Sequence, residues 1–131
     1  MNELKRKDLL YPELSFQIVG CAFEVYNEIG FGFKKIIYQK ALSLAFKEKG
    51  LSFKEQVKFE IKYKESLLES RFFDFIIDDS VVVEIKKDDK FSKRNIDQTI
   101  EYLRISNLKL ALLINFGREG VVYRRLINLS K

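Results

Sequence analysis

The amino-acid sequence predicts an α/β fold in which a mixed sheet is flanked by helices. Two N-terminal segments have apolar residues at helical spacing, the middle of the chain alternates between apolar and polar residues, and a wholly apolar segment follows a third helical pattern. A strand meander, a crossover helix and a buried strand together build a mixed sheet. The chain has 131 residues, 47% of them apolar, which fits one domain over residues 1–131.

The first two predicted helices lie near the N-terminus. One covers about residues 14–29 and ends at Gly30, a typical C-terminal cap. Its apolar residues recur at helical spacing: Leu14, Ile18, Cys21, Val25 and Ile29. Pro12 stands just before this pattern, where a helix start tolerates proline. The second helix is predicted over about residues 34–49, and Gly50 ends it.

The middle of the chain changes to a period of two, which indicates strands. Apolar and charged residues alternate from Val57 to Lys64, as in a half-exposed strand. A second strand is predicted over about residues 70–77, and residues 78–80 form a tight turn. The third strand, over residues 81–87, is rich in β-branched residues. Together these segments predict a three-stranded meander.

The last part of the chain adds one helix and two strands. Ser92 is a favourable N-cap for a helix that runs to about Ile105. Residues 108–115 are almost wholly apolar, as expected of a strand that is covered on both faces. A turn at residues 117–120 leads to a final strand over residues 121–126. The predicted order is therefore α-α-β-β-β-α-β-β.

Composition narrows the chemistry that the chain can perform. The net charge of +5 favours anionic partners such as nucleic acid, although many proteins carry such a charge for solubility alone. The sequence contains no histidine, which excludes histidine-based catalysis and histidine metal ligands. Cys21 is the only cysteine, so neither an intrachain disulfide nor a cysteine zinc site can form, and we expect this residue in the core.

From the sequence we expect neither a membrane span nor a secretion signal. The segment from Met1 to Leu10 is charged and lacks the apolar core of a signal peptide. The longest apolar run, Leu110–Ile114, is far too short to cross a bilayer. Together with the single cysteine, these features predict a soluble cytoplasmic protein without a membrane partner.

Three ionisable residues stand in or beside apolar strand patterns. Asp74 lies in a run of Phe and Ile, and Glu84 and Lys86 follow three valines. Burying such groups without compensation is costly, so a purely structural strand rarely contains them. Because Glu84 and Lys86 are two residues apart, they face the same side of their strand.

The hairpin register would bring the two carboxylates together. If residues 78–80 form the loop, Ile77 pairs with Val81, and Asp74 lies opposite Glu84 with Cβ atoms about 5 Å apart. Two carboxylates at that distance repel unless a cation lies between them, and hard oxygens suit Mg²⁺ or Mn²⁺. Such an ion serves phosphodiester hydrolysis, with a neighbouring lysine to position the attacking water. On this spacing alone, a hairpin whose charges merely pair with one another is an equally good interpretation.

The same residues resemble a known nuclease signature. Asp74, Glu84 and Lys86 are similar in type and order to the Asp…(Glu/Asp)-x-Lys motif of the PD-(D/E)XK nuclease superfamily. Residues 18–38 resemble the opening of the bacterial GxxExxY family, a branch of that superfamily. Two further stretches resemble motifs of this branch: residues 97–103 its Gln-x-x-x-Tyr-Leu helix, and residues 110–117 its Leu-Ile-Asn-Phe strand. The likeness covers nearly the whole chain.

The resemblance implies a restriction-endonuclease-like αβββαβ core with an extra N-terminal helix. The implied site residues are Asp74, Glu84 and the Ile85 carbonyl for Mg²⁺ or Mn²⁺, and Asp74, Glu84, Lys86 and Gln98 for catalysis. Lys86 would be the catalytic lysine, and Gln98 an auxiliary residue on the third helix. Tyr102 lies one turn further along the same helical face. An ordinary amphipathic helix explains Gln98 and Tyr102 almost as well.

The sequence departs from the family pattern at three places: Tyr26 replaces a histidine, Phe73 replaces a proline, and Lys35 bears directly on the predicted site. In the stretch from Gly32 to Tyr38, Lys35 stands where the family has the glutamate of its Gly-x-x-Glu-x-x-Tyr motif. An ammonium about 8 Å from a divalent ion would repel it by roughly 4 kcal/mol at an effective dielectric of about 20. The lysine chain can turn away from the ion, or it can contact a substrate phosphate.

Basic residues near the predicted site could follow a phosphate backbone. The residues expected to contact nucleic acid are Lys35, Lys87, Lys90, Lys93, Arg94 and Tyr102. A solvated loop is an equally good explanation of the basic run. Two functions remain open: a metal-dependent nuclease or nuclease-like phosphodiester hydrolase that acts on DNA or RNA, and a degenerate relative that binds nucleic acid or a protein partner without cleavage. Nucleases of this fold often dimerise to cut two strands, so a homodimer is included among the expected assemblies.

Overall fold

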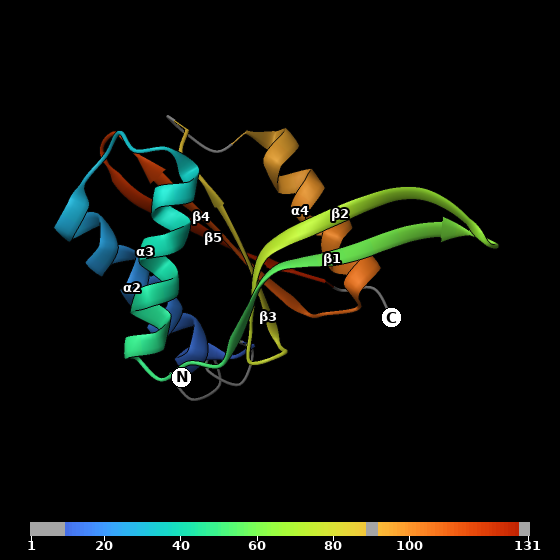
Figure 1. Cartoon of the computed structure of the whole chain (residues 1–131), viewed down its shortest axis with the longest axis horizontal. Coiled ribbons are helices and arrows are strands. Elements are labelled where there is room, and N and C mark those ends of the chain that lie inside the picture. Colours follow the sequence, from blue (N-terminus) through green and yellow to red (C-terminus); the bar gives the residue numbers. More distant parts are fainter. Residues whose placement is uncertain (1–9, 89–91, 129–131) are drawn as a thin grey trace, which may run out of the picture.

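The computed structural model describes residues 10–88 and 92–128, and it contains the predicted order of helices and strands (Figure 1). With the labels of Figure 1, the elements are α2 (Pro12–Ile29), α3 (Lys35–Glu48), β1 (Phe53–Tyr63), β2 (Ser66–Ile77), β3 (Val81–Lys86), α4 (Lys93–Ser106), β4 (Leu110–Gly117) and β5 (Gly120–Ile127). The chain therefore has the predicted α/β class, in which α2 is the extra N-terminal helix and an αβββαβ core follows it.

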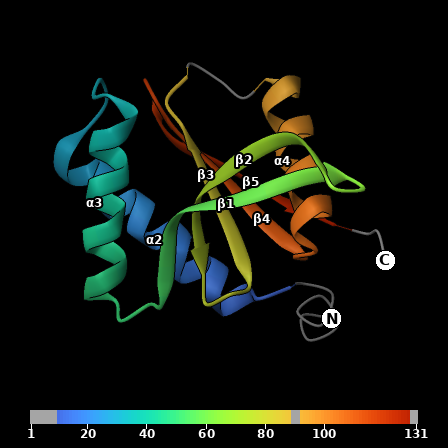
Figure 2. The same ribbon diagram turned by 45° about the vertical axis from the view of Figure 1, so that its right-hand side comes forward.

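A mixed five-stranded sheet forms the centre of the fold, with the strand order β1-β2-β3-β4-β5. β3 and β4 run parallel, while all other neighbours are antiparallel. α4 is the crossover between β3 and β4, because parallel neighbours need a long connection. α2 and α3 cover one face of the sheet, and α4 covers the other (Figure 2). β3 and β4 are buried almost throughout, and for β4 this confirms the prediction from its apolar pattern.

Local sequence signals set the ends of the helices. Pro12 occupies the first turn of α2, where its missing N–H costs nothing, and Gly30 follows the last turn with a positive φ of 76°. At α4, the Asn95 N–H donates a hydrogen bond to the Ser92 hydroxyl at 3.0 Å, which confirms the predicted N-cap. None of the described helices is long and apolar enough to span a bilayer.

The first two strands are longer than the sequence pattern predicted. β1 begins at Phe53 instead of Val57, and β2 begins at Ser66 instead of residue 70. The outer part of this hairpin runs past the body of the molecule (Figure 1), and residues 66–69 within it are exposed. Exposed strand residues need no apolar alternation, so the pattern could not reveal them. At the inner end, the alternation is interrupted by a bend.

The hairpin bends where Gln56 of β1 lies opposite Asp74 of β2. Gln56 has a left-handed φ of 47°, and the ladder of paired residues skips this position although its register is the same on both sides. Consequently Phe75 packs against α2 and α3, whereas Phe73, only two residues away, packs on the α4 side. A regular strand would point both rings to the same face. Asp74 therefore lies at the point where the strand changes faces.

Candidate active site

Asp74 and Glu84 lie side by side on β2 and β3, and both are buried, at 4% and 5% exposure. The ladder between these strands has the predicted register as far as the pair of Phe75 and Val83, and it stops one step before the two acids. Beyond this pair, a carboxylate oxygen accepts the N–H of the neighbouring strand in place of a backbone carbonyl. The Ile85 N–H donates to Asp74 Oδ2 at 2.8 Å, and the Asp74 N–H donates to Glu84 Oε2 at 3.3 Å. This reciprocal bonding fixes both carboxylates across the strand pair.

The start of α3 brings a positive charge to these two acids. Lys35 is the first residue of α3, and its Nζ lies 3.1 Å from Asp74 Oδ2. The lysine side chain is 42% exposed and the Asp74 side chain 5% exposed, so the contact links the surface to a buried acid. The position at which the sequence departs from the family's glutamate is therefore in direct contact with the acidic pair.

Amide side chains that the sequence analysis did not single out hold Asp74 from another direction. Gln56 Nε2 donates to Asp74 Oδ1 at 3.2 Å and to Gln39 Oε1 at 3.0 Å. Gln39 is buried on α3, one turn after Lys35. Its own Nε2 donates to Glu55 Oε1 at 3.4 Å. Asp74 is thus held by a side-chain amide, a backbone N–H and an ammonium.

One signal for this network was present in the sequence. Lys35, Gln39 and Ser43 recur every fourth residue, and they form a polar stripe on a helix whose other inward positions are apolar. Ser43 extends the network, because its hydroxyl donates to Glu55 Oε2 at 3.0 Å. The left-handed φ of Gln56 had no such signal, since glutamine is not among the residues that mark turns.

Burial dominates the electrostatics of Glu84. Loss of water raises the pKa of this carboxyl well above its usual range, and the neighbouring Asp74 charge raises it further. Lys35 and Lys86 offset this only in part. Glu84 therefore binds a proton readily beside the ion pair of Asp74 and Lys35. With Glu84 protonated, the charges of that ion pair balance one another.

The predicted lysines of the third strand lie at its end. Lys86 is half-buried and is the last residue of β3, two positions after Glu84 and on the same face of the strand. Lys87 follows it and is exposed. Lys90 lies outside the described residues. The catalytic role of Lys86 and the binding role of Lys87 stay predictions.

Tyr102 of α4 packs against Phe73, the residue before Asp74. Its ring is half-buried between the Phe73 ring, with centroids 5.1 Å apart, and the Arg71 guanidinium, which lies 4.8 Å from the Tyr102 centroid. Burial first, and then the charge of Glu84, raise the pKa of Tyr102. Gln98, one turn earlier, makes no hydrogen bond to either acid among the described residues.

The remaining predicted residues lie along the outer surface of α4. Gln98, Lys93 and Arg94 line an open groove of about 740 Å³. Lys93 and Arg94 are exposed, and Lys93 Nζ lies 3.0 Å from Asp97 Oδ2. The structure thus brings Lys35 into contact with Asp74, and it packs Tyr102 on Phe73, the neighbour of Asp74 in β2. It leaves the other three in a groove on the α4 side of the sheet.

The oxygen donors at the bend fit a hard divalent cation. Among the described residues no three His, Cys, Asp or Glu side chains gather as a metal centre, so the chain offers two carboxylates here. Mg²⁺ commonly binds through one or two carboxylates and keeps several waters or substrate oxygens. The Lys35 ammonium, 3.1 Å from Asp74, marks the place as one that holds a cation. A divalent ion would displace Lys35 to use the same oxygen.

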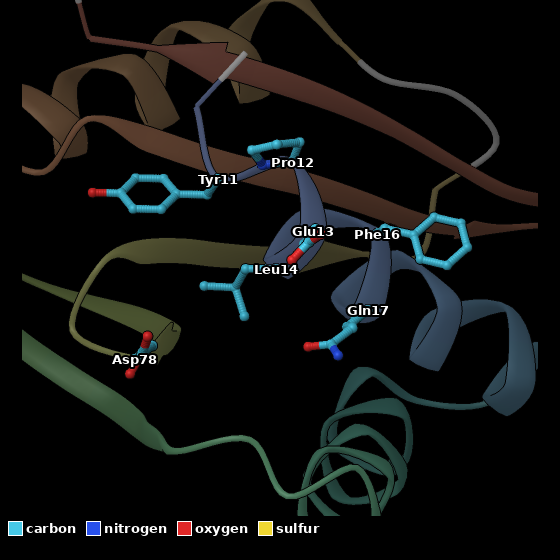
Figure 3. A pocket seen from close by; sticks show the side chains of 7 residues that line it. All are labelled: Tyr11, Pro12, Glu13, Leu14, Phe16, Gln17 and Asp78. Atoms are coloured by element: carbon cyan, nitrogen blue, oxygen red, sulfur yellow. The ribbon is translucent and has the colours of Figure 1, made fainter. Parts of the chain in front are cut away.

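A second opening lies beyond the end of β2, at the N-terminus of α2 (Figure 3). Its volume is about 770 Å³, and its lining includes Tyr11, Leu14 and Gln17 of the α2 region and Asp78 of the β2–β3 turn. The described lining contains no lysine or arginine, and two of its residues are acidic. An anionic phosphate would be repelled here, so this opening does not compete with the bend as the candidate site.

Comparisons with known proteins bear on the fold and the family. A family model described as the PD-(D/E)XK nuclease superfamily matches residues 12–126. Among solved structures, the chain is similar to the crystal structure of SSO0001, with 18% sequence identity and a TM-score of 0.56. The match covers 72% of this chain and 50% of that chain, so this chain spans about half of that protein's length, and the likeness is one of fold. No curated protein matches the chain.

Proposed function

The chain belongs to the PD-(D/E)XK nuclease superfamily, and we propose that it is a metal-dependent phosphodiester hydrolase that acts on nucleic acid. Nucleases of this superfamily generally depend on a divalent metal ion. The observation that carries the proposal is the reciprocal bonding of Asp74 and Glu84, which holds two buried carboxylates side by side. Burying two carboxylates together is costly, and a hard cation bound between them would offset this cost.

In this proposal Asp74, Glu84 and the carbonyl of Ile85 hold Mg²⁺ or Mn²⁺. The bound ion would supply charge stabilisation at the phosphate and a more acidic water. Lys86, on the same face of β3 as Glu84, donates to a phosphate oxygen or orients the attacking water. The side-chain amide of Gln56 and the backbone N–H of Ile85 orient the Asp74 carboxylate through their hydrogen bonds.

Basic and aromatic residues on both sides of the acids would bind the nucleic acid. Lys35 lies on the α3 side and Tyr102 on the α4 side, while Lys87 follows β3. The groove with Lys93 and Arg94 continues along α4, and Gln98, which also lines it, would contact the substrate there. Positive charge of this kind fits the phosphate backbone of DNA or RNA and predicts binding that weakens with salt.

Two features of the biological setting extend the proposal. The likeness of residues 18–38 and 97–103 to the GxxExxY motifs favours that bacterial branch of the superfamily. A nucleic-acid substrate fits a cytoplasmic location. Cutting both strands of a duplex takes two sites, so a homodimer belongs to the proposal, and analytical ultracentrifugation with and without duplex DNA would detect it.

A cleavage assay tests the proposal. Labelled single- and double-stranded DNA and RNA are incubated with the protein in Mg²⁺, in Mn²⁺ and in EDTA. We expect cutting that needs the metal ion and is lost in Asp74→Ala and in Lys86→Ala. The matched control Asp78→Asn changes an exposed acid in the neighbouring turn and should cut like the wild type. Cutting that persists in EDTA or in Asp74→Ala would contradict the proposal.

The contact between Lys35 and Asp74 favours a second candidate, a protein that binds nucleic acid without cutting it. An ammonium 3.1 Å from Asp74 satisfies this carboxylate without a metal ion. This candidate predicts salt-dependent binding of DNA or RNA, no cleavage by the wild type in either metal ion, and cleavage only in Lys35→Glu. The same assay therefore separates the two candidates.

A further inference from the structure

Lys35 and a divalent ion cannot use Asp74 at the same time. The ammonium lies 3.1 Å from Oδ2, the oxygen that also accepts the Ile85 N–H, and Gln56 donates to Oδ1. Two cations at contact distance from one buried carboxylate repel each other. Asp74 is fixed in the sheet by its hydrogen bonds and cannot turn to serve both. Metal binding therefore requires that Lys35 leaves.

The position of Lys35 allows it to leave. Its side chain is 42% exposed and long enough to reach solvent. It belongs to the first turn of α3, which contains no acidic residue and has no side-chain cap. The unpaired N–H groups and the positive end of the helix add to the attraction of this lysine for an anion. A phosphate group is thus a partner that Lys35 can take in place of Asp74.

We infer that Lys35 is a tethered cation that competes with the divalent ion for Asp74, and that a substrate phosphate relieves the competition by drawing Lys35 to itself. The inference rests on the proposed function of the site. It predicts that metal ion and nucleic acid each bind more tightly when the other is present. Without nucleic acid, the contact between Lys35 and Asp74 keeps the site poor in metal and inactive.

The first arm of the test measures metal binding without nucleic acid. Mn²⁺ is titrated into the full chain, and the free ion is followed by electron paramagnetic resonance. We expect Lys35→Gln and Lys35→Ala to bind Mn²⁺ at least about tenfold more tightly than the wild type, and Lys35→Arg to bind it as weakly. The matched control Lys34→Gln removes the same charge from the exposed residue before α3 and should change the affinity by less than about threefold.

The second arm measures the coupling between metal ion and nucleic acid. Binding of fluorescein-labelled phosphorothioate DNA, which resists hydrolysis, is followed by anisotropy with and without Mn²⁺. Mn²⁺ should tighten binding to the wild type by about tenfold or more, and to Lys35→Gln by less than about threefold, because the competition is absent there. Asp74→Asn reports the direct effect of Mn²⁺ on the DNA, and circular dichroism confirms that each variant is folded.

The inference is overturned if the wild type and both neutral Lys35 variants bind Mn²⁺ equally, or if the coupling is the same with and without Lys35. Neither result decides whether the protein hydrolyses nucleic acid, since that depends on cleavage and its loss in Asp74→Ala. Tight Mn²⁺ binding by Lys35→Gln, with no cleavage by any variant, would support the competition and reject the hydrolase. The two proposals therefore fail separately.

Discussion

Two lysine–aspartate ion pairs have almost the same N–O distance but lie in very different surroundings. Lys35 and Asp74 are 3.1 Å apart at the bend of the hairpin, and Lys93 and Asp97 are 3.0 Å apart on the surface of α4. The Asp74 side chain is 5% exposed, whereas the Asp97 side chain is 59% exposed. Two ion pairs of the same residue types and nearly the same N–O distance therefore differ in how deeply the aspartate is buried.

The difference comes from what else holds each acid. Asp74 accepts hydrogen bonds from Gln56 and from the Ile85 N–H, so it cannot turn toward water if its cation leaves. Asp97 lies one turn after Lys93 on an exposed helical face, where water replaces either partner at little cost. If its cation leaves, a buried carboxylate that cannot turn toward water is stabilised only when another cation takes that place. For this reason the bend is a candidate metal site.

The largest difference between the pairs is expected in catalysis. Under the proposed function, Asp74→Asn should lower the rate of metal-dependent cleavage by about a thousandfold or more, because the loss of a proposed metal ligand would remove several kcal/mol of charge stabilisation. Asp97→Asn should leave the rate within about threefold of the wild type. Single-turnover cleavage in Mg²⁺ measures both variants. Equal losses would show that burial does not distinguish the two acids.

Removing Lys35 should lower the free energy of unfolding more than removing Lys93 does, but this difference should be smaller than the one in catalysis. Lys35→Ala leaves a buried carboxylate with neutral donors only, and it should destabilise the fold by about 1–2 kcal/mol, less than for a fully buried pair because Lys35 is partly exposed. Lys93→Ala should cost about 0.5 kcal/mol or less. Urea unfolding at pH 7 in EDTA gives both free energies. A larger loss in Lys93→Ala would reverse the comparison.

Glu84 should make the stability of the bend depend on pH. Its pKa is raised in the folded chain, first by burial and then by Asp74, so the folded state holds this proton more tightly than the unfolded chain does. The resulting stabilisation is complete below the unfolded pKa of about 4.3 and is lost as the pH rises toward the folded value. Glu84→Gln stays neutral at every pH, so it should be more stable than the wild type at pH 7.

Thermal unfolding of the wild type and Glu84→Gln from pH 4 to pH 8, in EDTA, measures this effect. The two proteins should converge near pH 4 and separate as the pH rises. Glu13→Gln, which changes an exposed acid of α2, is the control and should follow the wild type. If the wild type instead gains stability over Glu84→Gln with rising pH, Glu84 is not the costly charge that its burial implies.

Cys21 is a buried group that has no part in either pair, and its reactivity tests only the packing of α2. Burial, followed by the Glu24 charge, raises the pKa of this thiol to about 11, so little thiolate exists at neutral pH. Ellman's reagent should react with the native protein far more slowly than with the protein in urea. Equally fast reaction in both states would show that α2 does not bury the thiol.

Much of the fold could be predicted because periodicity and burial agree in it. The apolar run of β4, the valines of β3 and the pairing of Ile77 with Val81 all follow from alternation and loop length. The bend could not be predicted, because glutamine does not signal a left-handed φ and the contact of Gln56 with Asp74 joins residues 18 positions apart. Periodicity describes regular strands, and the site lies where the strand is irregular.

The two acids of the candidate site could be predicted from the sequence, but most of the residues that surround them could not. Asp74 and Glu84 were found because charges in apolar strands are rare, and Lys35 was placed near them by resemblance alone. Its contact with Asp74 depends on the angle at which α3 meets the hairpin, which no local pattern encodes. For the same reason Gln98, a regular position on α4, lies along a groove and makes no bond to the acids.

Anomalous diffraction can identify the cation that Asp74 holds, and this is the most direct test of a site shared by Lys35 and a metal ion. Crystals of the full chain would be grown with Mn²⁺, with and without phosphorothioate DNA. We expect a manganese peak between Asp74 and Glu84 in the DNA complex, with Lys35 turned toward a phosphate, and Lys35 on Asp74 when DNA is absent. A DNA complex in which Lys35 still contacts Asp74 and no manganese lies beside the two acids would contradict the proposed site.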